Sequence, residues 1–348
     1  MKQLFDRSRQ SNENIAEALL WPTVLVTGLI ALVIFWNETA VKLVGGGSIG
    51  MIVLIFGAVL TLLVFTPAYL YGLKAHKEQL SNKQLVFNII SLTIASVVMT
   101  ILLTTLGVGL ISQSFKGLTL DRYISAVIVG VYCGLLVYVL VPAIIRLNTQ
   151  GIAQIFSIVM ICGMLLSMIT ASNPYWWQVN FSSLGSTDSP SAVAFNFTLI
   201  LSGLILITLS SHLLDDITKL LKGMSTKAQN VRVGLLKKLF IFIGVCMAGV
   251  GIFTYAEHPA LHNLSAYSMV IGFAIIIIGL KKILPFIDAT FLANSYFTLV
   301  IIGVCYFLFA KVGYLNLTAF ELLAFGITFA WLVVFIRKIN SLQTTSTT

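Results

Sequence analysis

Residues 19–36 read LLWPTVLVTGLIALVIFW and contain no charged side chain. Apolar runs of about 20 residues recur along the chain, and that length lets an α-helix cross about 30 Å of hydrocarbon. A strand of a membrane barrel would instead alternate apolar and polar residues over about 10 positions. The run at 19–36 therefore predicts a transmembrane helix.

The composition of the whole chain supports the same interpretation. Of its 348 residues, 58% are hydrophobic and 9% are charged, and the mean hydropathy is +0.99. A soluble globular protein carries about 25% charged residues, so this chain has too few to cover a surface that faces water. In lipid every backbone amide needs an internal partner, which a helix provides. We therefore expect an all-α polytopic integral membrane protein.

The apolar runs predict ten transmembrane helices. Trp21 and Trp36 flank the first of them, as expected for rings in the two interfacial layers of a membrane. We place the ten helices at residues 19–37, 48–72, 86–112, 123–145, 152–172, 192–213, 237–256, 265–285, 294–312 and 317–337.

The basic residues indicate the orientation of these helices, because cytoplasmic loops carry an excess of Lys and Arg. We predict that the N-terminus and the C-terminus are both cytoplasmic, in a bacterial cytoplasmic membrane. The 21 Lys and Arg residues then all lie on the cytoplasmic side except Lys42, Lys116, Arg122 and Lys311. Topology and anionic lipid account for the net charge of +9, so no nucleic-acid partner is expected.

The chain is expected to divide near residue 150, where residues 147–151 form a polar break. A four-helix membrane region at 19–146 precedes the break, and a six-helix membrane domain at 152–338 follows it. A cytoplasmic N-terminal segment, 1–18, and a polar cytoplasmic tail, 339–348, complete the chain.

Several short patterns are better explained by structure than by chemistry. Residues 45–50 read GGGSIG, but they join two predicted membrane helices and lack the strand that a dinucleotide loop or a nucleophile elbow requires. Gly130 and Gly134 have the spacing of closely packed membrane helices.

The inner loop 214–238 has the pattern of a short amphipathic helix at the membrane interface. The sequence has no P-loop, no HExxH and no CxxC, which argues against an ATPase or a standard zinc protease.

Ionisable residues at membrane depth carry more information, because they are costly in hydrocarbon. Glu321 is the clearest example, since it lies about one turn into the last predicted span, near the outer surface. Two roles are open for it: a part in a functional site, or a structural pair with Lys311 at the end of the preceding span.

Glu257, His258 and His262 cluster in the predicted outer loop between the seventh and eighth spans. The two histidines have the four-residue spacing of metal ligands on a helix. Pro259 interrupts that helix, however, and a third ligand would have to come from elsewhere. We expect a neutral, hydrogen-bonded histidine here, and we expect no metal and no cofactor.

Several elements of the second half together resemble a known family. They are NPYWW at 173–177, FSSLG at 181–185, AFN at 194–196, LSGL at 201–204, HNLSA at 262–266, and FEL at 320–322 with Trp331.

This pattern resembles the bacterial membrane family catalogued as domain of unknown function 998, which is itself similar to the eukaryotic FRAG/DRAM-type proteins. The resemblance covers residues 150–338 and implies a six-helix fold. Leu322 stands where the family has an arginine, so a pair between Glu321 and that arginine is not expected here. The eukaryotic relatives are linked with lipid remodelling and membrane trafficking, and the resemblance therefore implies a lipid theme.

The candidate site residues all fall on the predicted outer face. We hypothesise a site that binds or processes a lipid headgroup or another amphiphile at the outer leaflet, and whether it is an enzyme stays open. The polar candidates are Asn196, His262, Glu321, Ser182 and Asp188, and the candidate aromatic residues of the headgroup layer are Trp176 and Trp177.

Two other functional classes remain as alternatives. One is a transporter or exporter of a hydrophobic compound, although no charge lies near the middle of any predicted span, as an ion-coupled carrier would require. The other is a membrane scaffold or immunity-type protein without small-molecule chemistry. Membrane lipids are the expected partners, and the sequence identifies no protein partner.

Overall fold

The computed structural model describes residues 2–76, 80–186, 189–221 and 227–346. Within these ranges lie 10 helices that are long and apolar enough to cross a membrane, which confirms the predicted class and number. The chain divides into two compact units, Met1–Leu147 and Asn148–Thr348, which we call unit 1 and unit 2. The division falls within the polar segment 147–151.

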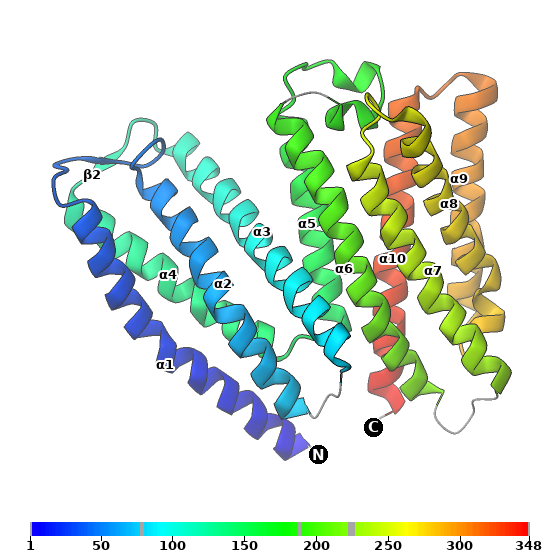
Figure 1. Ribbon diagram of the computed structural model, residues 1–348, viewed down its shortest axis with the longest axis horizontal. Coiled ribbons are helices and arrows are strands. Elements are labelled where there is room, and N and C mark those ends of the chain that lie inside the picture. The colour runs from blue at the N-terminus through cyan, green and yellow to red at the C-terminus, as the bar shows by residue number, and fades with distance from the viewer. Residues whose placement is uncertain (1, 77–79, 187–188, 222–226, 347–348) are drawn as a thin grey trace. The chain divides into compact units, whose positions relative to one another are not determined.

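Unit 1 consists of four long helices and two very short strands (Figure 1). The helices are α1 (Lys2–Ile34), α2 (Ile49–His76), α3 (Asn82–Ser114) and α4 (Arg122–Ile145). Strand β1 (Val41–Lys42) pairs antiparallel with β2 (Thr119–Leu120), so that Val41 lies opposite Leu120. The strand pair therefore joins the α1–α2 connection to the α3–α4 connection at one end of the unit.

Close backbone contact joins α1 to α4. A Cβ atom added at Gly130 of α4 would lie 2.6 Å from the backbone oxygen of Val24, and one added at Gly134 would lie 3.1 Å from that of Leu20. Any larger residue at these positions would force the helices apart. The structure thus confirms the packing role predicted from the spacing of the two glycines.

Hydroxyl and amide side chains link α3 to its neighbours inside unit 1. Such interhelical bonds satisfy polar groups that cannot reach water in a membrane. The bonds are Asn88 Nδ2 to Tyr69 OH at 3.3 Å, Thr61 Oγ1 with Thr100 Oγ1 at 3.0 Å, and Thr104 Oγ1 with Tyr132 OH.

Unit 2 contains six long helices, two 3₁₀ turns and one π-helical turn. Its first connection, between α5 and α6, contains both 3₁₀ turns. In chain order the elements are α5 (Thr149–Ile169), η1 (Trp176–Gln178), η2 (Phe181–Gly185), α6 (Pro190–Leu220), α7 (Lys227–Ile252), α8 (Pro259–Ile283), α9 (Ala289–Phe307), the π-helical turn η3 (Leu308–Val312) and α10 (Leu317–Ser346).

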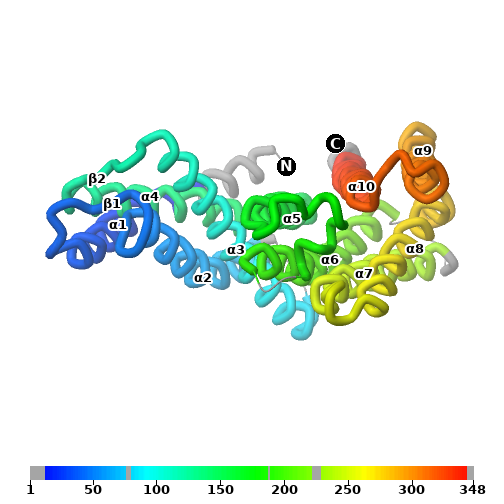
Figure 2. The backbone as a smooth tube through the Cα atoms, turned by 90° about the horizontal axis from the view of Figure 1, so that it is seen from above, coloured from blue at the N-terminus to red at the C-terminus, as the bar shows by residue number. Residues whose placement is uncertain are grey.

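The α5–α6 connection lies at the same end of unit 2 as the starts of α8 and α10 (Figure 1). Helix α10 contacts α5, α6 and α9, and the view from above shows it beside α5 and α9 (Figure 2). One end of the unit thus brings together η1, η2 and the first turns of α6, α8 and α10.

Aromatic side chains fill the space between α10 and the helices around it. Trp331 meets Phe273 of α8 edge-on, with ring centroids 4.9 Å apart, and lies 6.2 Å from Phe291 of α9. Phe335, one turn further on, stacks on Phe240 of α7 at 6.0 Å. Large rings hold α10 in place, whereas glycines hold α1 and α4 together in unit 1.

Two helix boundaries differ from the sequence-based expectations. Helix α1 begins at Lys2, within the predicted N-terminal segment 1–18, and α10 continues to Ser346, within the predicted tail 339–348. Backbone hydrogen bonding extends a helix into polar sequence that hydropathy alone assigns to a loop.

The prediction of a short interfacial helix at 214–238 is wrong. Its first part belongs to α6, which runs to Leu220, and its last part belongs to α7, which begins at Lys227. The apolar residues of the two parts differ in environment: Ile217 and Leu221 have exposed fractions of 0% and 3%, whereas Val231 and Leu235 have 68% and 49%. The pattern therefore combines residues of two separate helices and does not mark one short helix.

Candidate functional site

The candidate site is built around η2, the short turn Phe181–Gly185 in the α5–α6 connection. The turn is closed locally, because the Ser183 N–H and hydroxyl both donate to the carbonyl oxygen of Asn180, at 3.2 and 2.6 Å. Phe181 and Leu184 are buried, so one side of η2 packs into the helical unit.

Glu321 approaches η2 from the second turn of α10. Its Oε2 accepts a hydrogen bond from the backbone N–H of Phe181 at 2.5 Å, and the N–H of Ser182 also faces this carboxylate. Free N–H groups at the start of a helical turn favour an anionic partner. Among the described residues no ion pair joins Glu321 to Lys311, and Lys311 is exposed. The structure therefore places Glu321 on η2, and not in the alternative pair with Lys311.

His262 approaches η2 from the first turn of α8. It is buried, with an exposed fraction of 3%, and both ring nitrogens have partners. Nδ1 lies 2.9 Å from the carbonyl oxygen of Phe253, and Nε2 lies 3.0 Å from Ser182 Oγ. Because a carbonyl can only accept, we assign the proton to Nδ1, which leaves Nε2 as an acceptor for the Ser182 hydroxyl.

Asn196 approaches η2 from α6. Its Nδ2 donates to the carbonyl oxygen of Gly185 at 2.9 Å. Gly185 is required here, because an added Cβ atom would overlap Asn196 Oδ1 and lie 2.7 Å from the Phe195 ring. Ser191, also on α6, donates to the carbonyl oxygen of Leu184 at 3.2 Å. Polar side chains from three different helices thus hold one five-residue turn.

The three predicted polar residues converge on η2, and in the described part of the chain no hydrogen bond joins one of them to another. Glu321 holds the first residue of the turn, His262 the second, and Asn196 the last. Asp188, which was also predicted, lies outside the described residues. The shared element is therefore the turn itself, which the sequence analysis included in the motif at 181–185 and, among the candidate site residues, through Ser182.

The predicted aromatic pair is divided between two environments. Trp177 is exposed, at 48%, together with Tyr175 at 61% and Val179 at 58%. Trp176 is half-buried and lies 6.3 Å from the Phe181 ring. One tryptophan therefore supports the turn, while the other joins an apolar surface at the end of the unit.

Asn180 is a residue of this site that sequence reasoning missed. It precedes η2, has an exposed fraction of 5%, and its Oδ1 accepts no hydrogen bond from the described residues. A buried amide oxygen without a partner is unusual in folded proteins. The sequence offers one indication of this residue: Asn180 is polar, lies in a loop rich in aromatic residues, and precedes Ser182 by two positions.

The residues suggested by the metal-like spacing do not form a ligand cluster. Within the described part of the chain no group of three His, Cys, Asp or Glu side chains could hold a metal ion. His258 and Glu257 are exposed, whereas both nitrogens of His262 are already used. Pro259 starts α8, which places His258 before the helix and His262 within it.

Comparisons with known proteins add no assignment: neither a family model, nor a curated protein, nor a solved structure matches this chain. The site is therefore interpreted from its own geometry.

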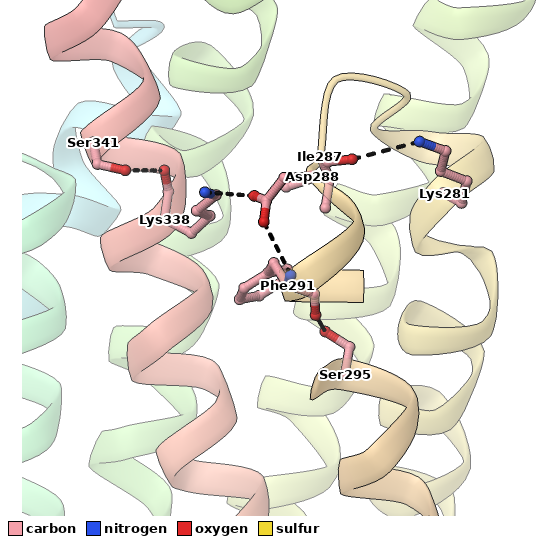
Figure 3. Close-up of polar contacts among 7 residues, drawn as sticks. All are labelled: Lys281, Ile287, Asp288, Phe291, Ser295, Lys338 and Ser341. Carbon is pink, nitrogen blue, oxygen red and sulfur yellow. Dashed lines mark hydrogen bonds and ion pairs between the residues drawn. The ribbon is translucent and has the colours of Figure 1, made fainter. Parts of the chain in front are cut away.

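The opposite end of unit 2 carries an ion pair between helices (Figure 3). Asp288 Oδ1 lies 2.5 Å from Lys338 Nζ of α10, while Oδ2 accepts from the Phe291 N–H at 3.1 Å and so caps α9. The hydrogen bond from Lys338 lowers the pKa of the Asp288 carboxyl, and the Phe291 N–H acts in the same direction. Nearby, Lys281 Nζ of α8 donates to the Ile287 carbonyl at 3.5 Å. These contacts are partly exposed and fasten the ends of helices.

Proposed function

We propose that unit 2 binds the polar headgroup of an amphiphile at the outer face of the bacterial cytoplasmic membrane. The observation that carries the proposal is the construction of η2. Three helices hold this turn through Glu321, His262 and Asn196, directly beside an exposed apolar loop. Such a loop suits the headgroup layer, where aromatic rings are enriched.

Polar groups at the same place support a headgroup as the ligand. Ser182 is half-buried, and Asn180 Oδ1 lacks a donor among the described residues. A headgroup that carries hydroxyl or amine donors would supply one on entering the loop, because protein atoms cover this oxygen. A purely apolar compound would leave that oxygen without a partner, at a cost of about 1–3 kcal/mol.

We propose that both termini are cytoplasmic. The site end of unit 2 then faces outward, and the outer segments carry few basic residues. Glu257 and Lys311 would then lie outside, whereas Asp288 and Lys338 would lie at the cytoplasmic end.

We further propose that residues 150–338 belong with the family catalogued as domain of unknown function 998. Elements of that pattern from distant parts of the sequence meet in one place: Ser182 and Gly185 in η2, His262 in α8 and Glu321 in α10. Leu322 remains a departure from the family pattern.

The alternatives have less support. A transporter would need a polar pathway near the middle of the membrane, but Asp288 precedes α9, Glu321 lies in the second turn of α10, and Lys338 lies just after the predicted span 317–337. A scaffold would not need a buried, unpartnered amide oxygen beside its exposed loop.

Photo-crosslinking tests the proposal. The purified protein is placed in nanodiscs that contain a phospholipid with a photoactivatable group in its headgroup, and adducts are mapped by mass spectrometry. We expect adducts in residues 173–186, reduced several-fold by Glu321→Gln and unchanged by Glu257→Gln, which alters an exposed carboxylate on the same end. Adducts spread evenly over all the loops would overturn the proposal, and adducts in the middle of the spans would favour an exporter.

A further inference from the structure

We propose that Ser182 is a nucleophile, that His262 is its general base, and that the reaction is hydrolysis of an ester-linked amphiphile. This inference rests on the proposed function, because the substrate is the amphiphile bound at η2. It goes beyond that function by naming a reaction and the atoms that perform it.

The hydrogen-bond pattern of His262 is that of a base ready to accept a proton. The Phe253 carbonyl holds Nδ1–H at 2.9 Å, which fixes the tautomer and the ring orientation. Nε2 is then left unprotonated, 3.0 Å from Ser182 Oγ. A nucleophilic hydroxyl, a base within hydrogen-bond reach and a third group that orients the base are the three parts of a serine nucleophile site. Here a backbone carbonyl occupies the place that a carboxylate often takes.

The surroundings hold the pair rigidly while leaving Ser182 partly accessible. His262 is buried, and the edge-on Tyr255 ring lies 5.7 Å from its ring centroid. Glu321 fixes the backbone next to Ser182 through the Phe181 N–H. Glu321 is therefore a positioning residue, and Ser182 and His262 are the proposed catalytic residues.

The neighbouring serine provides a contrast within the same turn. The Ser183 hydroxyl donates to the Asn180 carbonyl at 2.6 Å and has the Trp176 carbonyl at 3.5 Å. Neither partner can accept a proton permanently, so Ser183 has no base. The two adjacent serines thus have similar exposure, but only Ser182 has a base within hydrogen-bond distance.

The reaction balances with water as the only co-reactant. Ser182 Oγ attacks the ester carbonyl carbon while its proton passes to His262 Nε2. The bond from that carbon to the alkoxy oxygen then breaks, and His262 returns the proton to the leaving alcohol. Water, deprotonated by His262, attacks the acyl–Ser182 ester, the bond to Oγ breaks, and Ser182 recovers its proton. The products are a carboxylic acid and an alcohol.

The position of η2 limits which ester bonds Ser182 can reach, and so indicates the class of substrate. The turn lies at the end of unit 2, beside the exposed side chains of Tyr175 and Trp177. Ester linkages of membrane lipids lie at the boundary between headgroup and hydrocarbon, whereas bonds within the acyl chains lie deeper. A linkage at that boundary is the one that Ser182 can reach.

A fluorophosphonate probe tests the nucleophile directly, because it phosphonylates activated serines. The full-length protein in detergent should be labelled at Ser182, and Ser182→Ala should abolish the label, while Ser114→Ala, at an exposed serine that bonds within α3, retains it. His262→Gln should slow labelling about 100-fold, the usual contribution of a general base. Absence of label in folded wild-type protein, or an unchanged label in Ser182→Ala, would overturn the inference.

A second variant guards against loss of the fold. Ser182→Cys keeps a nucleophile at the same place, and its alkylation by iodoacetamide should be at least about tenfold slower when combined with His262→Gln. Melting temperatures of each variant show whether the fold persists. Equal alkylation rates in two folded variants would contradict a role for His262 as base.

These experiments separate the reaction from the proposed function. Headgroup crosslinking at 173–186 without phosphonylation of Ser182 would leave binding intact and overturn the hydrolase. Phosphonylation that depends on His262, without any lipid crosslink, would support the nucleophile and overturn a membrane amphiphile as its substrate.

Discussion

At the residue scale, Glu321 connects α10 to η2 by a hydrogen bond between a carboxylate and a backbone N–H. Glu321→Gln keeps the shape and removes the charge, so we expect the free energy of unfolding to fall by about 1–2 kcal/mol, because bonds to charged groups contribute about 1.5–3 kcal/mol. Thermal or denaturant unfolding in detergent measures this change. Lys311→Met is the control and should leave stability unchanged. A drop of equal size in both variants would point instead to a Glu321–Lys311 pair.

Gly185 is the second residue with a specific steric role. Gly185→Ala places a methyl group against Asn196 and Phe195, and overpacking of this kind costs about 1–3 kcal/mol. We expect the melting temperature to fall by several degrees. Gly46→Ala is the matched control, because an added Cβ atom there has no neighbour within 4 Å. An unchanged melting temperature of the Gly185→Ala variant would show that η2 can move away from α6.

The site residues illustrate what the sequence can and cannot predict. Glu321 and His262 stand out because ionisable groups are rare in apolar sequence, and alternation of the spans predicts that both lie at the same end of the helices. Their partners do not stand out, because the Phe181 N–H and the Phe253 carbonyl are backbone groups that every residue has. The Ser182–His262 contact joins residues 80 positions apart, and only the packed helices bring them together.

At the element scale, the ion pair at the start of α9 predicts a pH dependence. The pKa of Asp288 is lowered in the folded state, chiefly by Lys338, so this carboxyl stabilises the fold above its unfolded pKa of about 3.9. That contribution is lost as the pH falls through the lower, folded value.

Asp288→Asn should therefore remove part of the decrease in melting temperature that the wild type shows on acidification below about pH 4. Lys338→Met removes the main cause of the shift and should move the loss of stability to higher pH. Identical profiles for wild type and both variants would show that this pair does not contribute, as is common for exposed ion pairs.

The contact between α1 and α4 predicts a second effect at this scale. Gly130→Ala brings a Cβ atom to 2.6 Å from the Val24 oxygen. The backbone of α1 cannot move aside as a flexible side chain can. We expect a loss of about 1–3 kcal/mol, measured by unfolding of the full chain. Gly107→Ala in α3 has no neighbour within 4 Å and should be tolerated.

Helix positions follow from hydropathy, but helix ends do not. The predicted span 317–337 and the observed α10 share their first residue, whereas α10 continues to Ser346. Hydropathy detects where lipid begins and ends, but a helix ends where its hydrogen bonds end. The error at 214–238 has the same origin, since an amphipathic pattern does not reveal whether its apolar face meets lipid or another helix.

At the scale of the whole molecule, the predicted topology is tested by cysteine labelling in cells. In a variant with the native cysteines removed, Gln178→Cys should react with an impermeant maleimide from outside. Lys282→Cys should react only after the membrane is opened. Both positions are exposed, so accessibility depends on the side of the membrane. The reverse pattern would invert the topology and place η2 in the cytoplasm.

We propose that the η2 end of unit 2 is a site for an amphiphile headgroup. The most direct test is an experimental structure of the protein in lipid nanodiscs, determined by electron cryo-microscopy. We predict headgroup density beside Trp177 and within hydrogen-bond distance of Ser182 or Asn180, with its acyl chains directed along the helices. Lipid density confined to a cavity near the middle of the spans, with bare protein at η2, would show that η2 does not bind a headgroup.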